Sequence, residues 1–211
     1  MTTSDAYRRT RESLHAVAEQ LLAGPEYRHS KTIRLRAAPG GFATVREPNL
    51  AVREDLLLLD DAPVGRLHGA TIADLAAAAG LEPGMPGGVY ADVTGFDPHA
   101  ELWIDAAQSR TLTRAYELGD AALRALAPDR TPVLWPEHFD LGIDVDEVNY
   151  GISPGDGLIA EPYAYVGPWQ PRSGDFWNQS FGAARTLAEL GEPDALLAFF
   201  TAGRNAARAS G

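Results

Sequence analysis

The chain has 211 residues, 45% hydrophobic and 22% charged, which is typical of a folded globular protein and disfavours long disorder. Its formal net charge of -11 disfavours nucleic acid and anionic membrane surfaces as partners. It has no cysteine, which excludes disulfides, thiolate metal sites and a cysteine nucleophile. No signal peptide and no apolar run near the ~20 residues of a membrane span is found, so we expect a cytoplasmic protein.

The N-terminal half of the chain reads as helix, strands and helix. Apolar residues at helical spacing predict a helix from Ser4 to Leu22, ended by Gly24-Pro25. A second helix should begin at Thr71 and stop at Gly80. Between them the periodicity predicts short strands at 32–36, 42–45, 50–53, 56–59 and 64–67.

The C-terminal half begins after a Gly- and Pro-rich segment, 82–100, which we expect to be a long ordered loop. A helix capped by Asp105 follows, then strands, a helix from about Ser180 to Gly191 and a last helix from Pro193. This order predicts an α+β fold, with antiparallel sheet packed against helices. We expect 1–211 to form a single compact domain, with the loop joining subdomains 1–81 and 101–211 if it divides.

The densest stretch of aromatics, carboxylates and turn residues is 134–169. If a strand runs on from Val133, alternation places His138 and Asp140 on one polar face. The same alternation leaves Glu137 as the exception on an otherwise apolar face. Side chains two residues apart on a strand point the same way, so His138 and Asp140 become candidates for a shared site.

Two further strands, Val148 to Ser153 and one carrying the tyrosines, would complete a meander. Two readings of its polar face stay open: a surface that is simply solvated, or an aromatic-walled site for a small molecule. In the second reading, His138 is a general acid or base oriented by Asp140. The substrate-binding candidates are Glu137, Asn149, Ser153, Tyr163, Tyr165 and Trp169.

Other chemistries find less support in the sequence. His138 and Asp140 have the spacing of two metal ligands, but no later histidine completes a set, and we expect no metal. Ser153 precedes a proline and lacks the Gly-x-Ser-x-Gly context of a serine nucleophile. The glycine-rich segments lack the residues of a phosphate or dinucleotide loop, so no cofactor is expected.

Three segments of this stretch, Leu134-Trp-Pro-Glu-His-Phe-Asp-Leu, Tyr150-Gly-Ile-Ser-Pro-Gly-Asp and Glu161-Pro-Tyr-Ala-Tyr-Val-Gly-Pro-Trp, carry a resemblance. The chain resembles a group of actinobacterial proteins of unknown function, and a wider domain family with a similar Trp-Pro-x-His-Phe-Asp-Leu strand. The resemblance implies a shared fold and transfers no catalytic role. An actinobacterial source also fits a composition rich in Ala and Arg, with Lys31 as the single lysine.

Two functions from different classes remain. The first is binding of a small organic molecule at the sheet face, with acid–base catalysis if the protein is an enzyme. The second is a non-catalytic structural or protein-interaction role, in which the helix carrying Phe199 and Phe200 supplies a homodimer surface, although burial in the core is the commoner fate of such residues.

Overall fold

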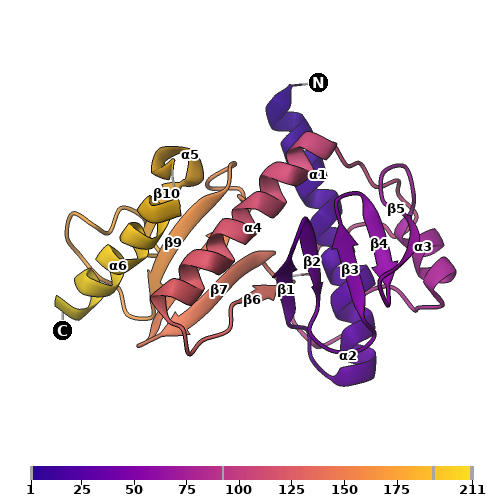
Figure 1. The fold of residues 1–211 in the computed structure, drawn as a ribbon, viewed down its shortest axis with the longest axis horizontal. Coiled ribbons are helices and arrows are strands. Elements are labelled where there is room, and N and C mark those ends of the chain that lie inside the picture. The colour runs from indigo at the N-terminus through magenta and orange to yellow at the C-terminus, as the bar shows by residue number, and fades with distance from the viewer. Residues whose placement is uncertain (1, 92, 192, 210–211) are drawn as a thin grey trace. The chain divides into compact units, whose positions relative to one another are not determined.

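The computed structural model describes residues 2–91, 93–191 and 193–209, and it confirms the α+β class (Figure 1). The chain divides into two compact units. The first comprises residues 1–114 and 134–139, and the second comprises 115–133 and 140–211. The Gly- and Pro-rich loop 82–100 therefore lies wholly within the first unit. In the part of the chain that is described, no helix is long and apolar enough to cross a bilayer.

In the first unit an antiparallel sheet packs against the N-terminal helices. Its strands follow the order β6-β1-β2-β3-β4-β5. The strands are β1 (Leu35–Ala38), β2 (Gly41–Thr44), β3 (Leu50–Arg53), β4 (Leu56–Leu59), β5 (Ala62–Arg66) and β6 (Val133–Trp135), whose Leu134 pairs with Leu35. The helices are α1 (Thr3–Val17), η1 (Ala18–Ala23), α2 (Gly24–Ser30) and α3 (Ile72–Ala79). As predicted, Thr71 caps α3 and Gly80 ends it in the left-handed conformation.

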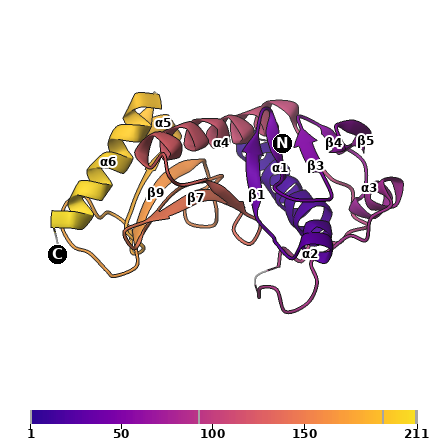
Figure 2. The same ribbon diagram turned by 60° about the horizontal axis from the view of Figure 1, so that its bottom comes forward.

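The first helical segment is longer than expected. We predicted a stop at Gly24-Pro25, but the chain passes through a π-helical turn, η1, and continues as α2 to Ser30. Proline is tolerated here because it stands at the start of α2, where its missing N–H costs little. Figure 2 shows this continuous helical segment lying along one face of the first unit's sheet.

In the second unit four antiparallel strands follow the order β7-β8-β9-β10. They are β7 (Asp140–Val145), β8 (Val148–Ser153), β9 (Tyr163–Pro168) and β10 (Ala183–Thr186); the helices are α4 (Ala106–Leu126), which begins in the first unit, α5 (Leu187–Leu190) and α6 (Pro193–Ala209). The prediction of a helix from about Ser180 is wrong. Its first half is strand β10, because residues 183–186 find hydrogen-bonding partners on the edge of β9, which local periodicity cannot reveal.

Helices α4 and α6 cover one face of this sheet. A Cβ added at Gly119 on α4 would collide with Ile152, and one added at Gly203 on α6 would lie 2.7 Å from a methyl group of Val166. Phe200 is fully buried and meets Tyr150 edge to face, with 6.1 Å between ring centroids. Phe199 is also buried. Both phenylalanines are therefore part of the core, which is the commoner fate of such residues.

Candidate functional site

The strand predicted to carry both His138 and Asp140 is interrupted. Strand β6 ends at Trp135, residues 136–139 form a turn, and β7 begins at Asp140. Phe139 has a φ of 54°, a left-handed conformation that no strand contains. The prediction that His138 and Asp140 share a strand face is therefore wrong. His138 is exposed in the first unit, whereas Asp140 belongs to the second.

A partly buried histidine holds this turn in the first unit. The Nε2–H of His15 donates to the carbonyl of Pro136 at 2.7 Å, since a carbonyl can only accept. The imidazole ring also stacks on Phe139, with 5.1 Å between centroids. Burial lowers the pKa of His15, so the ring is neutral near pH 7 with its basic lone pair on Nδ1. His15 thus fixes the turn.

Asp140 and the later candidates come together on one face of the second unit's sheet. Strand pairing sets Asp140, Ser153 and Tyr163 in one row across β7, β8 and β9, because Leu141 pairs with Ile152 and Ser153 with Tyr163. The next row is Gly142, Gly151 and Tyr165, and the third is Asp144, Asn149 and Gly167. Pleat alternation points these side chains away from α4 and α6. We call this surface the polar face.

Tyr165 lies across the polar face on a bed of glycine. A Cβ added at Gly151 would lie 2.5 Å from Cζ of Tyr165, and one added at Gly142 would lie 3.0 Å from its hydroxyl oxygen. Only residues without a side chain let the ring lean over β8 to β7, where its hydroxyl donates to Oδ2 of Asp140. Burial, and then the charge of Asp140, raise the pKa of Tyr165 well above its usual value, so the hydroxyl stays a donor.

A second tyrosine is held in the same way at the edge of the loop after β8. The hydroxyl of Tyr163 donates to Oδ2 of Asp156 at 2.6 Å, and Ser153 makes a further side-chain hydrogen bond with it. The other oxygen of Asp156 accepts the N–H groups of Leu158 and Ile159. Burial is the main reason that the pKa of Tyr163 is raised. The Ser-Pro-Gly-Asp segment thus closes its own loop and anchors a tyrosine ring.

The opposite end of the polar face is open to solvent. Trp169, which follows β9 in the same alternation as Tyr165, is 58% exposed. Its backbone N–H pairs with Glu147, and its indole N–H donates to Oδ1 of Asn149 over 3.4 Å. Asn149 and its partner Asp144 are both exposed. This end offers an indole, an amide and a carboxylate around Gly167.

Of the residues singled out from the sequence, the structure thus gathers six on or beside the polar face and leaves two elsewhere. The six are Asp140, Asn149, Ser153, Tyr163, Tyr165 and Trp169. Glu137 and His138 belong to the turn of the first unit. The expected oddity of Glu137, an acid on an apolar strand face, disappears because residue 137 is not in a strand.

Sequence reasoning missed a group of buried polar side chains on the first helical segment. Glu19 is 2% exposed and accepts from the hydroxyl of Tyr90 at 3.1 Å and from the N–H and hydroxyl of Thr94 at 3.0 and 2.7 Å. Gln20 donates to the carbonyl of Phe96 at 2.8 Å. Acidic and amide residues next to an apolar helix stripe indicate polar side chains that are buried together with a hydrogen-bonding partner, because such residues are rarely buried unless they are paired. These contacts secure the long loop to the π-helical turn.

Glu26 is the other missed carboxylate, fully buried in α2. Its Oε1 accepts the N–H groups of Val45 and Arg46 at 2.9 and 2.5 Å. Burial raises the pKa of Glu26 to about 7. Its oxygen thus ties the helical segment to the end of β2, and we assign it a structural role.

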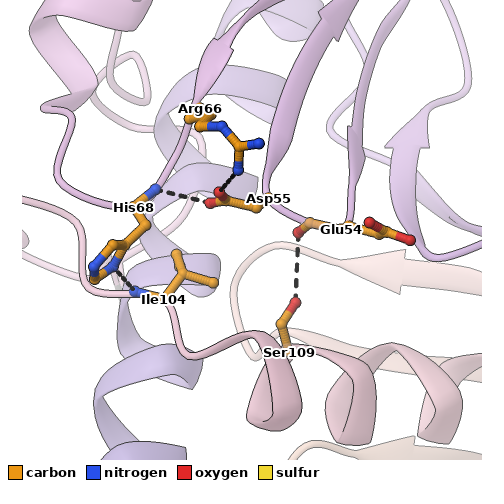
Figure 3. A network of polar contacts seen from close by, with 6 residues as sticks. All are labelled: Glu54, Asp55, Arg66, His68, Ile104 and Ser109. Carbon is orange, nitrogen blue, oxygen red and sulfur yellow. Dashed lines mark hydrogen bonds and ion pairs between the residues drawn. The ribbon is translucent and has the colours of Figure 1, made fainter.

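A network around His68 also has a structural explanation. Figure 3 shows Asp55 accepting from Arg66 at 2.8 Å and from the N–H of His68 at 2.9 Å, while Nδ1 of His68 accepts from the N–H of Ile104 at 3.0 Å. Both oxygens of Asp55 and one ring nitrogen are occupied in joining three chain segments. Across residues 2–91, 93–191 and 193–209, no three His, Asp or Glu side chains are arranged to hold a metal ion.

Comparison with known proteins leaves the site to be interpreted from its own geometry, since no family model, no curated protein and no solved structure matches the chain.

Proposed function

We propose that this protein binds a small organic molecule on the polar face of the second unit, at the end formed by Tyr165, Asn149 and Trp169. The observation that carries the proposal is the fixing of Tyr165. Its hydroxyl is occupied by Asp140 and its ring rests on two glycines, so the ring is held in place before any ligand arrives. A fixed aromatic beside an exposed one is suited to binding, because little side-chain entropy is lost.

The polar groups of this end support the same proposal. Small-molecule sites combine aromatic surface with a few placed polar groups that set orientation. Here the amide of Asn149 and the carboxylate of Asp144 lie opposite each other on adjacent strands, and both are exposed. The exposed indole of Trp169 adds an aromatic surface on which a ligand would stack.

We propose binding and not acid–base catalysis. The base expected from the sequence, His138, is exposed in a turn of the first unit. The groups that remain, Asp140 and the hydroxyls of Tyr163 and Tyr165, are bonded to one another or to Asp156. Their raised tyrosine pKa values keep those hydroxyls protonated near pH 7, which makes them poor bases.

A library of metabolites screened by thermal shift tests this proposal, with hits confirmed by calorimetry. Trp169→Leu removes the exposed ring and should weaken each true ligand about tenfold or more, as loss of an aromatic anchor commonly does. Tyr165→Phe keeps the ring but removes the hydroxyl that donates to Asp140, and should weaken binding less. Val93→Ala, which alters an exposed apolar side chain of the first unit, is the matched control and should change nothing. Ligands that bind Trp169→Leu as well as the unmodified protein would refute the site.

A further inference from the structure

The charges of the polar face select among ligands. In strands β7, β8 and β9, all described, the side chains on this face include two carboxylates, Asp140 and Asp144, and no lysine or arginine. Asp156 adds a third carboxylate beside Tyr163. Asp140 and Asp156 are engaged by tyrosine hydroxyls, whereas Asp144 is exposed at the open end. The side chains of these three strands therefore disfavour an anionic ligand, in a chain whose net charge is already -11.

The aromatic rings also favour a positively charged ligand. The face of a tryptophan or tyrosine ring carries the negative side of its quadrupole, which attracts a cation within about 6 Å of the ring centre. Tyr165 and Trp169 lie four residues apart on the same side of β9, so their Cα atoms are about 13 Å apart. Gly167 lies midway between them along the chain.

Both rings lean toward the neighbouring strand. The hydroxyl of Tyr165 reaches Asp140 over Gly151, and the indole N–H of Trp169 reaches Asn149. Asn149 stands opposite Gly167 on β8, and Asp144 stands opposite Asn149 on β7. The row from Gly167 to Asp144 therefore lies between the row of Tyr165 and the position of Trp169, and it ends at a carboxylate.

We propose that this row binds an organic cation, with an alkylated ammonium group between Tyr165 and Trp169 and its charge balanced by Asp144. The proposal rests on the proposed function, since it names the class of ligand for the same face. Alkylated ammonium fits better than a metal ion, because the carboxylates are separated by a row of glycine and two of them are already hydrogen-bonded. It also fits better than a bare ammonium, whose strong hydration favours water over rings.

Calorimetric titration with choline and with its uncharged carbon isostere, dimethylbutanol, tests the inference on the full chain. The two probes have the same shape and differ in charge. We expect choline to bind at least about tenfold more tightly, given the contributions of ring and carboxylate to a cation. The preference should shrink in high salt, because the open end of the site is screened.

Two variants separate the contribution of the Asp144 charge from that of the Trp169 ring. Asp144→Asn should weaken choline about fivefold at low ionic strength and leave dimethylbutanol unchanged. Trp169→Leu should weaken both probes. Asp175→Asn removes the same charge from another exposed position of the second unit and should change neither affinity.

The outcomes distinguish this inference from the proposal on which it rests. Equal affinity for both probes, lost in Trp169→Leu, would overturn the cation preference and leave the binding face intact. Choline binding that survives both Asp144→Asn and Trp169→Leu would overturn both. Failure of choline to bind, with neutral library ligands that depend on Trp169, would overturn only the cation.

Discussion

The two faces of the sheet in the second unit use the same strands in opposite ways. On the face covered by α4 and α6, large side chains such as Tyr150 and Ile152 fill the space beneath the helices. On the polar face, glycines occupy the centre and the ring of Tyr165 covers them. One face is stabilised by burial of apolar area and the other by a few hydrogen bonds to carboxylates. The difference teaches that dense aromatic sequence can encode both core and a prepared surface.

The largest expected effect of a substitution lies on the covered face. Phe200 is fully buried against Tyr150, so Phe200→Ala removes a ring and leaves a cavity. We expect it to lower the free energy of unfolding by about 3–5 kcal/mol. Urea denaturation measures the change, and Asn205→Ala, an exposed position on the same helix, should cost far less. A loss under about 1 kcal/mol for Phe200→Ala would contradict the packing described.

On the polar face, the position most sensitive to added volume is Gly151. A methyl group there would lie 2.5 Å from Cζ of Tyr165 and 2.7 Å from the carbonyl oxygen of Leu141. Gly151→Ala should therefore lift the ring, break its bond to Asp140 and destabilise the fold by about 1–3 kcal/mol.

Gly157→Ala is the control for Gly151→Ala, because a Cβ at Gly157 would have nothing within 4 Å. A double-mutant cycle of Gly151→Ala with Tyr165→Ala should show strong coupling, since removing the ring relieves part of the clash. Additive effects would mean that the ring of Tyr165 does not rest on Gly151.

Sequence alternation foresaw most of this sheet and failed where the backbone left the strand. It correctly placed Asn149 and Ser153 on the face of the sheet opposite to that of Tyr150. Side chains of an antiparallel strand that is covered on one face alternate between core and solvent. It failed at 136–139. Phe139 adopts a left-handed conformation there although it is not a glycine, so the sequence gives no local sign of the turn. It also assigned His138 to the site, because an unrecognised turn makes the strand alternation wrong for the residues that precede it.

The sequence predicted most residues of the candidate site but not the hydrogen bonds that hold them. The sequence located Tyr163 and Tyr165 on one face, but it could not show that their hydroxyls would be taken up by Asp156 and Asp140. The bond of Tyr165 depends on the glycines at 142 and 151, which stand opposite each other on two strands. In the same way Glu19 gained its partners from a loop some 70 residues away along the chain, as the bond from Tyr90 shows. Such long-range pairing leaves no trace in local periodicity.

Alkaline titration sharpens the comparison of the two faces with a smaller effect. Burial raises the pKa of Tyr150 to about 12 on the covered face, and burial with Asp140 raises that of Tyr165 on the polar face. A tyrosine whose folded pKa exceeds its unfolded value of about 10 binds its proton more tightly in the folded state. Each stabilises the fold fully below pH ~10 and loses that contribution as the pH rises toward its folded pKa.

Urea midpoints between pH 9 and 11.5 measure the slope, to which each such group contributes up to about 1.4 kcal/mol per pH unit. Tyr165→Phe and Tyr150→Phe should each make the decline less steep, although Tyr165→Phe also leaves Asp140 without that hydroxyl and lowers stability below pH 10. Val93→Ala, which removes no ionisable group, should leave the slope unchanged. An unchanged slope in both test variants would show that neither hydroxyl is held as described.

The smallest effect on stability should come from Trp169, the residue that the proposed function makes most important for binding. Trp169 is 58% exposed and its strand contact to Glu147 is made by the backbone, so Trp169→Leu keeps that hydrogen bond. We expect the free energy of unfolding to change by no more than about 0.5 kcal/mol, as for other surface substitutions. Chemical denaturation without ligand measures this. If Trp169→Leu instead costs as much as Phe200→Ala, the indole belongs to the core, and weaker ligand binding in that variant would report damage to the fold and not the loss of a binding surface.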